Sequence, residues 1–163
     1  MPARQTRSLL VALAATAPVA GCGDGPVAAT PAALVGSWRS RVEAIQPQGS
    51  WQRTLVVHPD MRVESRGVTY GLYPGDAPGA VSASSALYGR LGATGTRFLI
   101  QPDSLVTEDR FHGPDYHHVQ RDFTGLPSDS TAFEIRGGVL TLTYYSYPAD
   151  APVVTRSVYY RVR

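Results

Sequence analysis

The chain has 163 residues, of which 43% are apolar or aromatic and 17% charged, which fits a globular domain and excludes collagen, coiled coils and disulfide-rich miniproteins. All fifteen basic side chains other than histidine are arginine, and the absence of lysine and asparagine excludes Schiff-base chemistry and asparagine-linked glycosylation. Without Arg4 and Arg7, thirteen arginines balance thirteen Asp plus Glu. A neutral chain has little attraction for phosphate backbones, so no nucleic-acid partner is expected.

Residues 1–21 have the pattern of a signal peptide for export. Arg4 and Arg7 precede an uncharged apolar run over residues 9–17, as a positively charged region precedes the hydrophobic region of such a peptide. The run is too short to span a membrane, since a spanning helix needs about 20 apolar residues. It leads to Val19-Ala20-Gly21-Cys22, which resembles the lipobox of bacterial lipoproteins.

The lipobox resemblance implies cleavage before Cys22, diacylglycerol on its sulfur and usually a third acyl chain on its amine. Two or three acyl chains exceed the one-chain limit of reversible binding, so the membrane anchor should be permanent. Gly23, and not Asp, follows the cysteine, which in that family favours the outer over the inner membrane. The alternative is an ordinary secretory peptide that leaves Cys22 as a free thiol. We expect residues 22–33 to be the lipidated cysteine and a flexible tether, and residues 34–163 the folded domain.

From Leu34 onward, apolar and polar residues alternate with period two, which predicts about ten short strands. They are expected at residues 34–43, 51–58, 62–70, 87–91, 96–101, 105–111, 117–123, 132–136, 139–147 and 153–162. The stretch 80–86, rich in Ala and Ser, is the one plausible short helix. Successive hairpins of this kind predict an all-β fold, an antiparallel up-and-down barrel of about eight to ten strands, with a sandwich as the alternative.

Turn residues predict the register of individual hairpins. Gly137-Gly138 suits a two-residue turn, which would pair Ile135 with Leu140 and Phe133 with Leu142. By the same reasoning a turn at Pro102-Asp103 would pair Ile100 with Leu105. Alignment of Val57 with Val63 requires a three-residue loop or a bulge around Asp60.

Both ends of the folded part carry further motifs. Gly36-Ser37-Trp38 begins the first strand and Tyr159-Tyr160-Arg161-Val162 ends the last, and together they resemble the bacterial lipocalin-like (calycin) group. This resemblance implies that Trp38 plugs the closed end of the barrel and that Arg161 packs across its ring. The Thr-Asp-x-x-Tyr pattern and the cysteines of animal lipocalins are absent, so their lipid transport is not implied.

Several aromatic residues and one arginine are candidate ligand-binding residues. Arg53 falls on the same face as Trp51 and Leu55, and an inward arginine in a small barrel requires a carboxylate partner or a bound anion. A bulge that turns it to solvent is the alternative. Inward Tyr144 and Tyr160 could supply hydroxyl groups to a ligand. Aromatic residues are also ordinary strand formers and core fillers, and that reading is preferred for most of them.

The densest polar cluster spans residues 109–118, where His112, Asp115, His117 and His118 are candidate metal ligands. A solvated loop is the commoner explanation of such a cluster, because the spacing matches no known closed site. The chain has no motif of a nucleophilic hydrolase, a zinc protease, a P-loop or a dinucleotide-binding fold. We therefore expect no enzymatic activity and no cofactor.

These observations predict a lipid-anchored protein of the cell envelope whose barrel binds a small apolar or amphipathic ligand. Two alternatives stay open at this point. One is a filled barrel that acts structurally, through contacts with another envelope protein. The other is a metal-binding protein that uses the histidine-rich loop.

Overall fold

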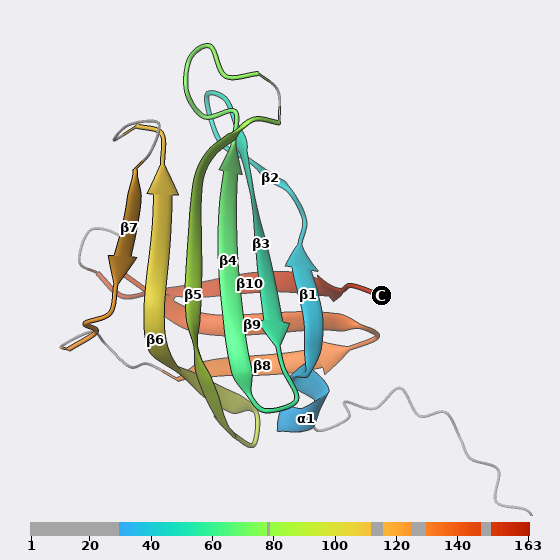
Figure 1. The fold of residues 1–163 in the computed structure, drawn as a ribbon. Helices are drawn as coiled ribbons and strands as arrows, with labels where there is room; N and C mark the ends of the chain where they lie inside the picture. The colour runs from blue at the N-terminus through green and yellow to red at the C-terminus, as the bar shows by residue number, and fades with distance from the viewer. Residues whose placement is uncertain (1–29, 78, 112–115, 125–129, 148–150) are drawn as a thin grey trace, which may run out of the picture.

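The computed structural model describes residues 30–77, 79–111, 116–124, 130–147 and 151–163. One short helix, α1 (Pro31–Leu34), precedes a single ten-stranded sheet (Figure 1). The strands are β1 (Gly36–Ser40), β2 (Glu43–Ala44), β3 (Ser50–Val57), β4 (Arg62–Tyr70), β5 (Val81–Thr94), β6 (Arg97–Asp109), β7 (His117–Gln120), β8 (Thr131–Arg136), β9 (Val139–Ser146) and β10 (Val153–Arg161). No helix in the described ranges has the length and apolar character needed to cross a membrane.

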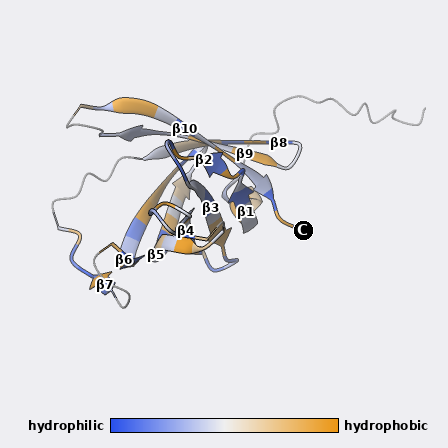
Figure 2. Ribbon diagram, turned by 90° about the horizontal axis from the view of Figure 1, so that it is seen from above, coloured by the Kyte–Doolittle hydropathy of each residue, from blue (hydrophilic) through white to orange (hydrophobic). Residues whose placement is uncertain are grey.

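The sheet closes on itself. Eight strands pair in chain order and antiparallel, from β1 through β3, β4, β5, β6, β8 and β9 to β10, and β10 returns to β1. The strands β2 and β7 are additions on β3 and β6. In Figure 1, β3–β6 cross in front of β8–β10, and Figure 2 shows both groups of strands around one interior. The predicted all-β up-and-down barrel is therefore confirmed.

Two of the predicted hairpin registers are confirmed. Phe133 pairs with Leu142 and Ile135 with Leu140 across the Gly137-Gly138 turn, where both glycines have positive φ angles, of 54° and 79°. Val57 pairs with Val63, and Met61 takes a φ of 62° in the connecting loop. In both hairpins this register brings the apolar side chains to the inner face. A shift of the pairing by one residue would turn them outward.

Two local predictions were wrong. Pro102-Asp103 is not a turn, because β6 runs through it to Asp109 and the pairing with β5 shifts there, between Tyr88 and Gly89. Such a bulge tolerates a proline, which has no N–H to donate to the ladder. Residues 80–86 form no helix: β5 begins at Val81 and extends to Thr94. Its small residues Ser82, Ser84 and Ala86 are buried on the outer face, between longer side chains of β4 and β6.

The apolar core fills one end of the barrel. Leu34, Trp38 and Leu140 have no exposed surface, and eight further buried residues pack with them: Leu55, Val57, Val63, Leu91, Phe98, Phe133, Leu142 and Tyr159. Most lie toward the ends of their strands that surround α1. The strands continue beyond this core, and several of their inward residues there are small or polar.

Candidate ligand-binding site

Trp38 and Arg161 close the filled end of the barrel. The buried indole Nε1 of Trp38 donates a hydrogen bond to the carbonyl of Leu34 at 2.7 Å, and the Arg161 guanidinium lies 4.3 Å from the centroid of its ring. Arg161 also donates to the carbonyls of Ala33, at 2.8 Å, and Val35, at 3.1 Å. This is the arrangement that the lipocalin-like resemblance implies for these two residues.

Gly36 leaves the space that Arg161 occupies. A Cβ at position 36 would lie 2.8 Å from Nη1 of Arg161, and the φ of Gly36 is 133°, where side chains are rarely tolerated. Position 36 therefore requires glycine, because the side chain of Arg161 from the last strand occupies the space next to it.

The other half of the barrel encloses a hollow of about 330 Å³ that opens to solvent. Its walls come from β3, β4, β5 and β6. The lining residues are Trp51, Arg53, Ser65, Arg66, Gly67, Val68, Thr69, Ala83, Ser84, Ser85, Leu87, Leu105, Thr107 and Asp109. Five of these residues carry hydroxyl groups, and Leu87 faces Leu105 to form an apolar area.

Arg53 is the basic residue on the inner face of this hollow. Its guanidinium lies 4.3 Å from the centroid of the Trp51 ring and 5.8 Å from that of Tyr159. Nη1 donates a hydrogen bond to the hydroxyl of Tyr144 at 3.1 Å, and that hydroxyl also lies 3.1 Å from Oγ of Ser157. Nε is shielded from solvent and has no hydrogen-bond partner. One side of the guanidinium is therefore fixed, while its Nε side faces no acceptor.

No carboxylate neutralises Arg53 among the described residues, whose ion pairs all involve other side chains. Asp109 is the one carboxylate in the lining, and its Oδ1 accepts hydrogen bonds from the Tyr73 hydroxyl and the Phe111 N–H, both at 2.8 Å. Burial raises the pKa of Tyr159, and the charge of Arg53 opposes that rise. An inward cation without a counter-ion is the main electrostatic feature of the hollow.

The five predicted ligand-binding residues do not all lie at the hollow. Trp51 and Arg53 line the hollow, and Tyr144 reaches Arg53 from β9. Leu55 is only 2% exposed and belongs to the packed core. Tyr160 was expected to point inward and does not: it pairs with Arg39 on the outer face, and the buried Tyr159 takes the inward position. Aromatic residues occur at both positions, so the sequence alone did not fix the direction of either.

Sequence reasoning missed the small residues of the wall. Gly67 of β4, Ser85 of β5 and Thr107 of β6 lie in register, and Ser65 lies two residues before Gly67 on the same face of β4. None of them carries a large side chain. Their signal was present in the sequence, since every second residue of 63–69 is small or β-branched. It was read as ordinary strand alternation, because the strand pairing that joins these positions into one wall was not known.

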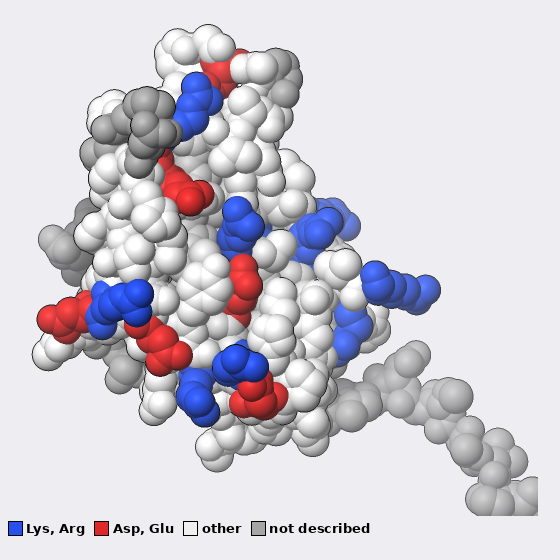
Figure 3. All heavy atoms as spheres, in the orientation of Figure 1, with Lys and Arg blue, Asp and Glu red and all other residues white. Residues whose placement is uncertain are grey.

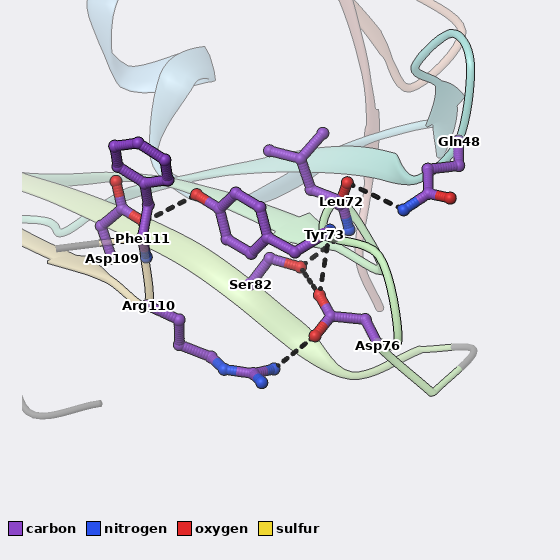
Figure 4. Close-up of polar contacts among 8 residues, drawn as sticks. All are labelled: Gln48, Leu72, Tyr73, Asp76, Ser82, Asp109, Arg110 and Phe111. Carbon is purple, nitrogen blue, oxygen red and sulfur yellow. Dashed lines mark hydrogen bonds and ion pairs between the residues drawn. The ribbon is translucent and has the colours of Figure 1, made fainter. Parts of the chain in front are cut away.

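A polar network holds the rim of the hollow (Figure 4). Asp76, in the loop between β4 and β5, accepts hydrogen bonds from Ser82 Oγ at 2.6 Å and from Arg110 Nη1 at 2.8 Å. The bond from Ser82 is the main cause that holds the pKa of Asp76 below its usual value, and Arg110 contributes. The bond to Asp109 raises the pKa of Tyr73. The loop is thereby fastened to the end of β6, beside the Asp109 wall.

The predicted metal ligands that the structure describes do not come together in a cluster. His112 and Asp115 lie outside the described residues. His117 and His118 pair with Glu108 and Thr107 of β6, so as neighbours in a strand they point to opposite faces. Nδ1 of His117 lies 3.5 Å from Oε1 of Glu108. In the part of the chain that the structure describes, no three His, Cys, Asp or Glu side chains are close enough to hold a metal ion.

The sequence matches no protein-family model, and no curated protein matches it. The functional argument therefore depends on the barrel and the chemistry of its interior.

Proposed function

We propose that this protein is a non-catalytic barrel that binds a small amphipathic molecule through a carboxylate or a similar planar anion. The observation that carries the proposal is Arg53, whose shielded Nε has no hydrogen-bond partner and whose guanidinium forms no ion pair with any described residue. A guanidinium offers parallel N–H groups that match the two oxygens of a carboxylate. A carboxylate in the hollow would pair with the guanidinium while Tyr144 keeps Nη1, and it would reach Nε once the side chains that shield this atom move aside.

The rest of the hollow sets the kind of ligand. A volume of about 330 Å³ is at the lower end of the range of small-molecule sites, roughly 300–1,000 Å³. Leu87 and Leu105 offer apolar contact, and hydroxyl groups such as those of Ser65 and Thr107 offer hydrogen bonds. The size and lining of the hollow favour a ligand that is a compact acid with a short apolar body and one or two polar groups.

The test compares octanoate with octanamide, which has the same chain length and no charge. Binding to the full chain is followed by the fluorescence of Trp51, which stacks on Arg53, with a Trp51→Phe variant to identify the signal. A charged hydrogen bond contributes about 1.5–3 kcal/mol, so octanoate should bind about 30-fold more tightly than octanamide. Arg53→Met should remove that preference. Equal affinity of the native protein for both compounds would refute the proposed anion site.

We also propose that Cys22 carries the lipid anchor and that the domain belongs to the cell envelope, more often at the outer than at the inner membrane. The sequence Val19-Ala20-Gly21-Cys22 after the apolar run supports this. Growth of an expressing bacterium with a labelled fatty acid should label the native protein and leave Cys22→Ser unlabelled. Equal labelling of both would overturn the assignment.

A further inference from the structure

Arginines without ion-pair partners gather on the outer face of the barrel around β1. Arg39, Arg41, Arg66 and Arg156 are all exposed, and among the described residues none of them forms an ion pair. Three other arginines have carboxylate partners: Arg62 with Asp60, Arg110 with Asp76 and Arg136 with Glu134. The balance of charges from residue 22 onward therefore conceals a basic side, and Figure 3 shows basic side chains along the side that carries β1.

The strand pairing brings two of these arginines into one row. Arg39 of β1 lies opposite Thr54 of β3, and Thr54 lies opposite Arg66 of β4. Adjacent strands are about 4.8 Å apart, so the two arginine backbones are about 10 Å apart. They border a shallow hollow of about 400 Å³, whose other walls include Gln52, Thr54 and Tyr70.

The other two arginines extend this row toward β10. Tyr160 pairs with Arg39, and the guanidinium of Arg41 lies 5.2 Å from the centroid of the Tyr160 ring. Arg156 lies four residues before Tyr160 and so on the same outer face of β10. Two acidic residues lie close by in sequence: Glu64, two residues before Arg66 on the same face of β4, and the exposed Glu43, two residues after Arg41. Three arginines on three strands, together with Arg41 just after β1, form a broad basic face rather than a pocket for one small anion.

We infer that this basic face docks on anionic lipid headgroups and lays the barrel on its side against the membrane. The proposed anchor makes the contact reachable, since only seven residues lie between Cys22 and Thr30, and these eight steps span at most about 29 Å when fully extended. The chain then enters the barrel through α1 and continues into β1, which is the strand that carries Arg39. Each arginine at an anionic surface strengthens binding about fivefold, and guanidinium groups pair well with phosphate.

The test uses the full chain with Cys22→Ser, so that no lipid is attached and only the protein surface is measured. Sedimentation with vesicles of phosphatidylcholine is compared with vesicles in which about one third of the lipid is phosphatidylglycerol. Binding should require the anionic lipid and should fall steeply between about 0.05 M and about 0.3 M salt. Binding that is equal on both kinds of vesicle would overturn the inference.

Paired variants separate the basic face from total charge. Arg39→Gln with Arg41→Gln, neither of which lines the hollow of Arg53, should weaken binding about 25-fold. Arg62→Gln with Arg136→Gln removes the same charge from arginines that have partners and should weaken it less than about threefold. Equal losses would refute the face. Inorganic phosphate and glycerol phosphate serve as competitors: if millimolar amounts abolish vesicle binding, the site is for a small anion and the docking inference fails. Octanoate binding through Arg53 should be unchanged in both variants.

Discussion

The two ends of the barrel each hold an arginine over a tryptophan, at the same distance of 4.3 Å, yet the two pairs have different surroundings. At the filled end, Trp38 has no exposed surface and Arg161 donates to two main-chain carbonyls. At the open end, Trp51 is partly exposed and Arg53 keeps a shielded donor without an acceptor. The first pair completes the packing of a core, whereas the second leaves a charge unsatisfied beside a hollow. The same contact is therefore part of a packed core at one end, whereas at the other it lies beside the hollow that we propose as a ligand site.

The largest expected difference is between the two tryptophans. Trp38→Ala should lower the free energy of unfolding by about 3–5 kcal/mol, as for other fully buried aromatic residues. Trp51→Ala should cost about 1 kcal/mol, because it loses a partly exposed contact with Arg53. Urea titrations of both variants measure the two values. Similar costs would mean that the ends do not differ as described.

The two arginines should differ next. Arg161→Met should lower the free energy of unfolding by about 2–3 kcal/mol, through two hydrogen bonds and the contact with Trp38. Arg53→Met should change it by less than about 1 kcal/mol, because Arg53 is only half-buried and loses a single part-buried hydrogen bond to Tyr144. A large loss in Arg53→Met would show that Arg53 is a structural residue.

Gly36→Ala probes the space beneath Arg161. The new Cβ would meet Nη1 and the backbone would be strained at a φ of 133°, so a loss of about 1–2 kcal/mol is expected. The double variant with Arg161→Met should lose less than the sum of the single losses, since the clash is then absent. Additive losses would mean that Gly36→Ala destabilises the protein through backbone strain alone and not through a clash with Arg161.

The smallest expected effect concerns the rim. The pKa of Asp76 is lowered in the folded protein, so its contribution to stability is present above about pH 4 and is lost as the pH falls through the lower, folded value. Asp76→Asn should therefore reduce the change in urea midpoint between about pH 5 and about pH 3. An unchanged acid dependence in Asp76→Asn would assign the acid sensitivity to other carboxylates.

Much of the fold could be predicted because alternation and turn chemistry act locally. Gly137-Gly138 defined both a turn and a register, and the apolar partners Phe133 and Leu142 agreed with it. Pro102-Asp103 has the same local appearance but lies in a bulge of two long strands, opposite Gly89. The ladder there is so close that a Cβ on Gly89 would lie 2.3 Å from the carbonyl oxygen of Gln101. Only the pairing partner distinguishes the two cases.

The candidate site could be predicted in part for a similar reason. Arg53 was found because a charge among inward apolar residues is unusual, and this signal needs no knowledge of the partner strand. Tyr144 was found, but its role depends on Arg53, ninety-one positions earlier in the chain. The wall of Ser65, Gly67 and Ser85 and the inward direction of Tyr159 require the register of separate strands, which no local pattern supplies.

The most direct test of the difference between the two ends is the stability of the native protein and of Arg53→Met with and without octanoate. A ligand at a hundred times its dissociation constant stabilises a folded protein by about 2.7 kcal/mol. The native protein should gain about this amount, measured by urea unfolding, and Arg53→Met should gain almost nothing at the same concentration. Equal gains in both proteins, or none in the native protein, would contradict the account of the open end as an anion site.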